Sequence, residues 1–256
     1  MYILGQLIHN NQVIEQLSAL GIQTIDKVPE DGGGICIIRT HGAAPQTFRE
    51  LEERGFKIID ATCPDVKRVQ NKAKTLAQEG YRVVIIGKAE HPEVVAIKAY
   101  ADLYSKKEAL VISSVDEINK YINEIREAKK IGIVIQTTQK MENFKKVLPI
   151  IAENSKELKV HNTVCSATFK RQQEAIGLAK DVELMIVVGS RSSANTTHLA
   201  EILSGIIQTI HIENHEEIDI YRDTIEKTSK IGITAGASTP EFLINEVINK
   251  IGDLNT

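Results

Sequence analysis

The sequence predicts an α/β fold made of three small domains, each built on a parallel sheet. Short apolar runs rich in Ile and Val alternate with amphipathic helical patterns, which is the order expected of parallel strands covered by helices. Each run ends in a small polar turn, and most of the prolines stand where a helix is expected to begin. These three observations support one another, because each places the strand, the turn and the helix in the same repeating order.

Six apolar runs carry the prediction of strands. They occur within residues 34–45, 56–65, 81–93, 130–140, 183–195 and 230–241, each with its polar turn. Helical periodicity is clearest in residues 46–55, 66–80, 198–207 and 242–251, where apolar positions recur every three to four residues. Because the strands are apolar on both faces, we expect helices on both sides of each sheet.

Proline supports the expected helix starts. Pro45, Pro64, Pro92 and Pro240 each precede a helical pattern, at positions where the missing N–H costs nothing. Acidic residues follow three of them, which matches the positive end of a helix. A new turn and helix begin near residues 63 and 163, and we therefore expect domains at residues 1–62, 63–162 and 163–256.

Composition excludes several classes of function. The chain has 256 residues, 42% of them hydrophobic and 25% charged, with a formal net charge of −3. No basic block suggests nucleic-acid binding, no apolar run is long enough to span a membrane, and the N-terminus does not resemble a secretion signal. Three widely spaced cysteines do not suggest a disulfide framework, so we expect a cytoplasmic protein.

Chemically active side chains concentrate in the polar turns. In open α/β sheets, ligands bind beyond the carboxyl ends of the strands, and these turns occupy that position. The candidates are His9, Asn10, His41, Cys63, His91, Glu93, Thr137, Thr138, Cys165, Ser193, Asn195 and Ser238.

Each candidate also has a purely structural interpretation. Glu93 after Pro92 suits the start of a helix, Ser193 and Ser238 suit helix caps, and Thr137 suits a strand. A cysteine can be a small buried hydrophobic residue. For Cys36, which isoleucines flank in a predicted strand, the structural interpretation is preferred.

The motifs taken together resemble one enzyme family. LGQLIHNNQV, THG, DATCP, HPEV, QTTQ, CSAT, RSSANT and GITAGASTP occur here in the order and spacing seen in 4-hydroxy-3-methylbut-2-enyl diphosphate reductases. The resemblance covers essentially the whole chain. It implies three small α/β domains in a trefoil around a central [4Fe–4S] cluster, and reduction of an allylic diphosphate in the last step of the non-mevalonate isoprenoid pathway.

The resemblance also implies roles for particular residues. It makes Cys63 and Cys165 cluster ligands, and it assigns Glu93 to proton delivery and Thr137 to the reacting hydroxyl. The residues that it implies for substrate binding are His9, His41, His91, Thr137, Ser193, Ala194, Asn195 and Ser238. Ala194 stands where the family often has a second serine, so only its backbone N–H is expected to contribute. The implied electron donor is a protein such as ferredoxin or flavodoxin.

One departure from the family pattern concerns the N-terminus. The family begins with a strand and a Gly-Phe-Cys turn that supplies the first cluster cysteine, whereas this sequence starts at what resembles the second strand. We therefore expect an incomplete first domain and two of the three cluster cysteines. This leaves two alternatives to the reductase: a diphosphate-binding relative without a cluster or turnover, and a zinc hydrolase, which the lack of an HExxH or CxxC motif disfavours.

Overall fold

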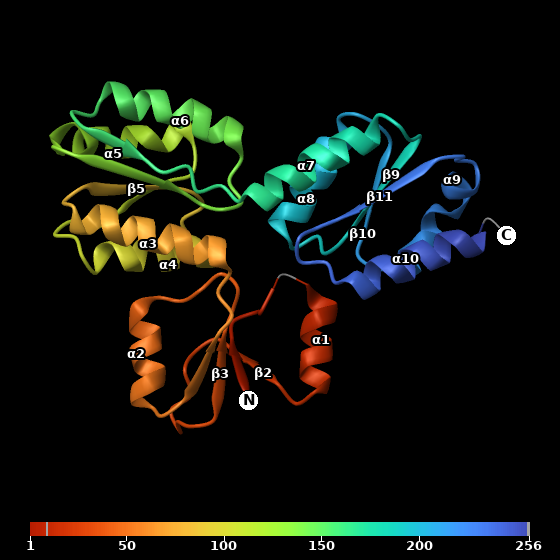
Figure 1. Cartoon of the computed structure of the whole chain (residues 1–256), viewed down its shortest axis with the longest axis horizontal. Helices are drawn as coiled ribbons and strands as arrows, with labels where there is room; N and C mark the ends of the chain where they lie inside the picture. Colours follow the sequence, from red (N-terminus) through yellow and green to blue (C-terminus); the bar gives the residue numbers. More distant parts are fainter. Residues whose placement is uncertain (9, 255–256) are drawn as a thin grey trace. The chain divides into compact units, whose positions relative to one another are not determined.

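The computed structural model describes residues 1–8 and 10–254, and for residues 11 and 166 it describes the backbone alone. Over these residues the chain forms three parallel β-sheets whose strands alternate with helices (Figure 1). The predicted fold class is thereby confirmed. The chain divides into two compact units, which are Met1–Leu7 with Leu17–Cys165 (unit 1) and Ile8–Gln16 with Ser166–Thr256 (unit 2). The domain boundaries expected from the sequence remain predictions.

The first sheet of unit 1 has the strand order β2-β1-β3-β4. Its strands are β1 (Tyr2–Leu4), β2 (Gln23–Ile25), β3 (Ile35–Ile38) and β4 (Lys57–Asp60). Helix α2 (Pro45–Glu53) follows β3, and α1 (Asn11–Ala19) crosses the division between the units. Cys36 lies in β3 and is fully buried beside Ile38 and Leu51, as expected of a structural residue.

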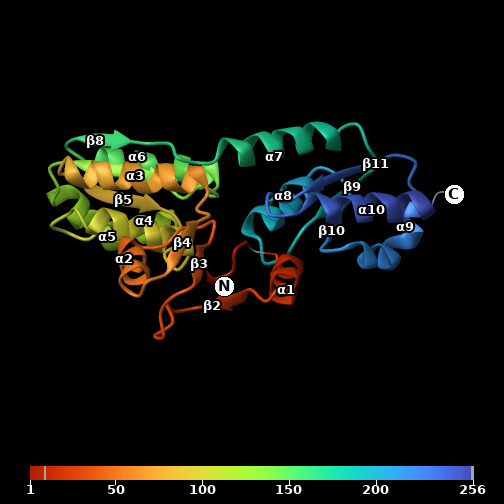
Figure 2. The same ribbon diagram turned by 60° about the horizontal axis from the view of Figure 1, so that its bottom comes forward.

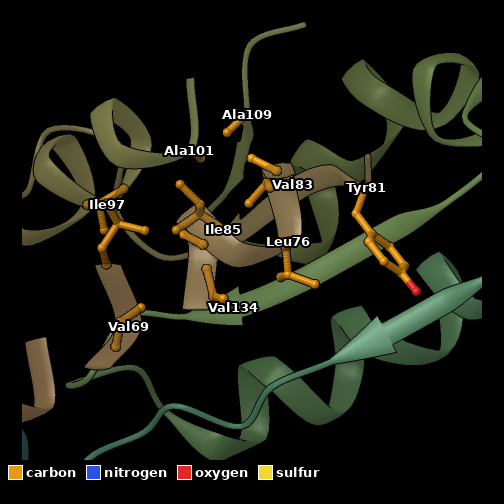
Figure 3. Close-up of a cluster of buried hydrophobic side chains, with 12 residues drawn as sticks. Val69, Leu76, Tyr81, Val83, Ile85, Ile97, Ala101, Ala109 and Val134 are labelled. Carbon is orange, nitrogen blue, oxygen red and sulfur yellow. The ribbon is translucent and has the colours of Figure 1, made fainter. Parts of the chain in front are cut away.

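The second sheet of unit 1 has the order β6-β5-β7-β8 and is covered on both faces. Its strands are β5 (Arg82–Ile86), β6 (Leu110–Ile112), β7 (Ile131–Ile135) and β8 (Leu158–Val160). Its helices are α3 (Pro64–Gln78), α4 (Pro92–Asp102), α5 (Val115–Glu127) and α6 (Met141–Glu153). Val83 and Ile85 pack against α3 and α4, as Figure 3 shows, while Val84 and Ile86 pack against α5 and α6. The alternation of side chains along a strand thus creates two cores from one apolar run.

Unit 2 contains the third sheet, with the order β10-β9-β11. Its strands are β9 (Leu184–Val188), β10 (Thr209–Ile212) and β11 (Ile231–Ala235). Its helices are α7 (Ser166–Ala179), α8 (Ala194–Ser204), the 3-10 helix η1 (His215–Tyr221), α9 (Arg222–Glu226) and α10 (Glu241–Leu254). The paired strands β9 and β11, and α10 after them, can be followed in Figure 2.

The short strands at the sheet edges were not predicted. β2, β6, β8 and β10 have three or four residues each, and several of their side chains are partly exposed. A strand of three or four residues is too short to show a clear hydrophobic period, and a strand that is partly exposed to solvent also has fewer apolar residues. The central strands were predicted because burial on both faces requires continuous Ile and Val.

Parallel pairing brings the polar turns of one sheet to the same edge. Glu93, Thr137 and Cys165 follow β5, β7 and β8 of the second sheet, and Ser193 and Ser238 follow β9 and β11 of the third. Among the described residues, no helix is long and apolar enough to cross a membrane.

Candidate functional site

The centre of the site in unit 1 is a buried carboxyl group bonded to a buried threonine. Glu93 is only 1% exposed and Thr137 only 6%. The Thr137 backbone N–H donates to Glu93 Oε1 at 2.7 Å, and the Thr137 hydroxyl donates to Glu93 Oε2 at 2.7 Å. Both carboxyl oxygens of Glu93 therefore accept hydrogen bonds from one residue, Thr137, which follows the neighbouring strand β7.

Local sequence explains why Glu93 points inward. His91 caps α4 by accepting a hydrogen bond from the Glu93 backbone N–H at its Nδ1, and Pro92 occupies the first position of the helix. β5 and β7 are neighbours in register, so the first turn of α4 and the turn after β7 meet at one edge. Glu93 thus lies in the first turn of a helix, where an acid is stable, and is also a buried site residue.

Burial changes the protonation of this carboxyl group. Removal from water raises the pKa of Glu93, the two hydrogen bonds from Thr137 partly oppose the rise, and the nearby Asp65 carboxylate adds to it. A carboxyl group whose pKa is raised keeps its proton at a higher pH than an exposed one. Glu93 is therefore suited to hold a proton that an exposed glutamate would already have lost, and to deliver it to a bound substrate.

The raised pKa predicts how stability depends on pH. Because folded Glu93 binds its proton more tightly than the unfolded chain does, its contribution to stability is complete below the unfolded pKa. That contribution is lost as the pH rises through the folded pKa, by about 1.4 kcal/mol for each pH unit between the two values. In Glu93→Gln this loss should disappear. Urea unfolding at several pH values from 4 upward measures it, with the exposed Glu90→Gln as the control. Parallel stability curves for the parent and Glu93→Gln would contradict the assignment.

Two of the three cysteines lie at this end of unit 1. Cys63 caps α3, and its backbone N–H donates to the Thr40 carbonyl at 3.0 Å. The Cys165 thiol donates to Asp65 Oδ2 at 2.8 Å, and Asp65 lies in the first turn of the helix that Cys63 caps. The Cys165 backbone N–H donates to the Thr137 carbonyl at 2.9 Å, which connects this thiol to the acid–hydroxyl pair. Cys36 is buried in the first core and does not take part.

The chemistry of these thiols suits a soft metal centre. Both are partly accessible and neither forms a disulfide, and thiolates are the usual ligands of iron–sulfur clusters. Binding a metal requires Cys165 to lose the proton that it shares with Asp65. Asp65 also contacts Arg68 at 3.2 Å, so a charged partner is present for its carboxylate after that loss. Within residues 1–8 and 10–254, no three His, Cys, Asp or Glu side chains are grouped closely enough to hold a metal ion.

Two histidines add polar groups to the site. The rings of His41 and His91 meet edge to face, with their centroids 5.2 Å apart. The turn that carries His41 closes at Gly42, whose φ of +76° favours glycine. A side chain at Gly42 would also come too close to the Gln70 amide nitrogen, so the end of the Gln70 side chain would have to move. His9, the third predicted histidine, lies outside the described residues.

The predicted hydroxyl and amide groups of unit 2 form a separate cluster. Ser193 is buried, caps α8 and accepts a long hydrogen bond of 3.4 Å from the Thr196 backbone N–H. The Ser238 hydroxyl lies 3.5 Å from the Ser193 hydroxyl, and Asn10 donates to the Ser238 carbonyl at 3.4 Å. Ala194 and Asn195 form the first turn of α8, where backbone N–H groups attract anions. The cluster therefore offers several donors and a helix start without a cationic side chain.

Several residues of the site were not predicted. Asp65 was recognised only as a helix-start acid, although it contacts the Cys165 sulfur. Gln136 is buried and accepts a hydrogen bond from the Lys88 backbone N–H at 3.0 Å, which ties the turns after β5 and β7 together. Thr196 is fully buried in α8, and no partner of its hydroxyl was found in the described part of the chain. The only signal for these residues in the sequence is that each lies next to, or within, a motif that carries a predicted site residue.

The fold and the site define a class of protein. Parallel α/β sheets whose strand ends carry a buried acid–hydroxyl pair, thiols suited to a metal centre and an anion-binding helix start are typical of an enzyme.

Comparisons with known proteins specify the family. A family model described as LytB protein matches residues 1–252. The 4-hydroxy-3-methylbut-2-enyl diphosphate reductase of Pelobacter propionicus is 40% identical over 255 residues, which are 99% of this chain and 88% of that protein. The Geobacter metallireducens protein of the same name is 40% identical over 256 residues, covering 100% of this chain and 87% of that protein.

Solved structures agree with this assignment. One of (E)-4-hydroxy-3-methyl-but-2-enyl diphosphate reductase, described as the terminal enzyme of the non-mevalonate pathway, is 38% identical with a TM-score of 0.76. The alignment covers 99% of this chain and 88% of that one. A Plasmodium falciparum reductase structure is 27% identical with a TM-score of 0.82, covering 97% and 77%. This chain belongs to the LytB protein family, and the predicted resemblance is confirmed.

Proposed function

We propose that this chain catalyses the reductive dehydroxylation of (E)-4-hydroxy-3-methylbut-2-enyl diphosphate to isopentenyl diphosphate and dimethylallyl diphosphate. Relatives about 40% identical over the full chain bear the name of that reductase. The single observation that carries the proposal is the buried Glu93–Thr137 pair, whose carboxyl group is suited to hold a proton. It lies in the same unit as two thiols suited to an iron–sulfur cluster.

The reaction needs a proton source at the leaving oxygen. The allylic C–O bond breaks, the hydroxyl leaves as water after taking one proton, and two electrons with a second proton form the new C–H bond. Hydroxide is a poor leaving group, so protonation of the oxygen lowers the barrier. We propose that Glu93 supplies this proton and that the Thr137 hydroxyl, which already bonds to Glu93 Oε2, positions and relays it.

We propose Cys63 and Cys165 as ligands of a [4Fe–4S] cluster. When bound, such a cluster supplies the two electrons one at a time. The resemblance implies a third thiolate from a Gly-Phe-Cys turn ahead of Met1. Cys36 does not replace it, because that side chain is fully buried in the first core. A protein such as ferredoxin or flavodoxin would renew the electrons, and a cytoplasmic location suits both the reduced thiols and the donor.

The diphosphate is proposed to bind through hydrogen-bond donors rather than through a cationic patch. In unit 2 these are Ser193, Asn195, Ser238 and the backbone N–H of Ala194, at the start of α8. For substrate binding the resemblance also implies the three histidines His9, His41 and His91. A helix start and several neutral donors can hold a diphosphate in a chain whose net charge is −3.

Anaerobic turnover tests the proposal. The chain, carrying the Gly-Phe-Cys turn that the resemblance implies, is purified and reconstituted with iron and sulfide, then given the allylic diphosphate and a chemical electron donor. We expect a brown protein that converts the substrate to both products, as measured by mass spectrometry. A protein that acquires the cluster and binds the substrate without consuming it would reject the proposed reaction.

One observation favours a second candidate. Cys36 is buried in the first core, so the partly accessible thiols at the site are those of Cys63 and Cys165, two in number. The alternative is a diphosphate-binding relative without turnover. Colourless protein that binds the diphosphate with a stoichiometry of one would support this alternative.

A further inference from the structure

A cavity of about 530 Å³ lies at the opposite end of the second sheet. Arg82 begins β5 and Lys130 immediately precedes β7, so the cavity lies at the amino ends of the strands whose carboxyl ends carry Glu93 and Thr137. A five-residue strand separates the two ends by roughly 16 Å. The cavity lies wholly within unit 1, and its volume is in the range of small-molecule sites.

Arg82 is the group in this cavity that most needs a ligand. Its side chain is 10% exposed, and its Nη2 donates to Glu124 Oε2 at 2.6 Å. Its Nε and Nη1 are buried, and no hydrogen-bond partner was found for either among the residues that the structure describes. Buried N–H groups of a charged side chain are costly to leave unpaired. Because Nε and Nη1 have almost no accessible surface, an anion in the cavity would meet the guanidinium at Nη2, where it would displace or join Glu124.

The charges around Arg82 indicate an anion with more than one negative charge. Five cationic and two acidic side chains line the cavity, although the chain as a whole is acidic. The cationic ones are Arg82, Lys106, Lys107, Lys129 and Lys130. Lys130 is 3.5 Å from Glu157, whereas Lys106 and Lys107 form an exposed pair at the rim. Phosphate groups match such a mixture of guanidinium and ammonium donors.

Two tyrosines give the cavity an apolar component. Tyr81, which belongs to the buried cluster drawn in Figure 3, and the exposed Tyr104 both line it, together with Ala77 and Ala128. The Tyr81 hydroxyl bonds to Glu157 at 2.6 Å, which holds the ring in place. A ligand that combines phosphate with a flat or apolar part would use both kinds of surface.

We propose that this cavity is a binding site for a phosphorylated small molecule of about nucleotide size, with Arg82 as its buried anchor. The site is separate from the residues proposed for the reductase reaction and does not depend on that function. Because Arg82 and Lys130 adjoin β5 and β7, a bound ligand stabilises the strands that also position Glu93 and Thr137.

Backbone amide NMR of the isotope-labelled chain, titrated with adenosine monophosphate or with inorganic diphosphate, tests the proposal. We expect saturable shifts at residues 80–82, 104–107 and 128–130. Lys106→Ala with Lys107→Ala should weaken this binding at least tenfold. Lys145→Ala with Lys146→Ala, an exposed lysine pair on α6 away from the cavity, should leave it unchanged.

Arg82→Gln provides a second test of the anchor. If the Arg82→Gln variant folds, the ligand should cause no shifts at residues 80–82, 104–107 and 128–130. If the variant does not fold, the comparison of the two lysine double variants tests the proposal. Absence of saturable shifts at the cavity with both probes, or equal weakening in the two lysine pairs, would overturn the proposal. Shifts confined to residues 193–196 and 238 would assign the anion to unit 2 alone and would also overturn it.

Discussion

Replacing Glu93 with glutamine is expected to lower turnover by about a hundredfold or more, the usual effect of losing a general acid. The change preserves the size of the side chain and its ability to bond to Thr137, but it removes the titrating proton. Cluster absorption and substrate affinity should stay near those of the parent, since neither depends on that proton. If Glu93 only stabilised the start of α4, the cost would be roughly 0.3–1 kcal/mol of stability with normal turnover.

The comparison is steady-state reduction by a chemical electron donor. Parent and variant both carry the Gly-Phe-Cys turn that the resemblance implies ahead of Met1, so that all three thiolates are present. Glu90→Gln is the matched control, because Glu90 is an exposed glutamate in the turn that precedes α4. An unchanged rate in Glu93→Gln would remove Glu93 from the mechanism and leave it as a helix-start residue.

Cys165→Ser is expected to abolish cluster absorption and to reduce turnover to background. A serine hydroxyl is a much harder and more weakly acidic ligand than a thiol, so it does not replace thiolate at iron. The fold should survive, because Cys165 is only partly buried and its backbone bond to the Thr137 carbonyl does not need the sulfur. Cys63→Ser should behave in the same way, since the Cys63 backbone caps α3 without using its side chain.

The buried third cysteine offers a matched control. Cys36→Ala removes a sulfur from the first core, so it should lower stability by about 1–2 kcal/mol while leaving the cluster absorption intact. Visible absorption after anaerobic reconstitution, together with iron content, measures both effects. Cluster loss in Cys36→Ala with retention in Cys165→Ser would contradict the proposed ligands.

Much of the architecture was predictable from local pattern. The runs around Val84, Val134 and Ile186 require burial on both faces, and the structure places them in the centres of the second and third sheets. Pro45, Pro64 and Pro92 begin α2, α3 and α4, as expected of residues without an N–H. The edge strands β2, β6, β8 and β10 were missed, because a run of three or four residues is too short to show a period; in β2 and β8, exposure also weakens the apolar signal.

The candidate site was predictable as a set of residues but not as a geometry. The motifs placed Glu93, Thr137 and Cys165 in turns after strands; the structure has Thr137 and Cys165 there, and Glu93 one step further on, in the first turn of α4. That Thr137 donates to Glu93 twice follows from the parallel pairing of β5 with β7, which joins positions 44 residues apart. The contact of Asp65 with the Cys165 sulfur, across 100 residues, had no signal in the sequence.

The sequence by itself therefore determined the long apolar strands, several of the helices that follow them, the turns that carry reactive side chains, and the family to which the chain belongs. Hydrophobic period, proline position and motif order are local properties, and they can be read without knowing which strands are neighbours. Only the tertiary structure decided the raised pKa of Glu93, the separation of Cys36 from the other two cysteines, and the buried setting of Arg82. These properties depend on desolvation and on partners distant in the chain, and both arise only when the sheets and their covering helices pack.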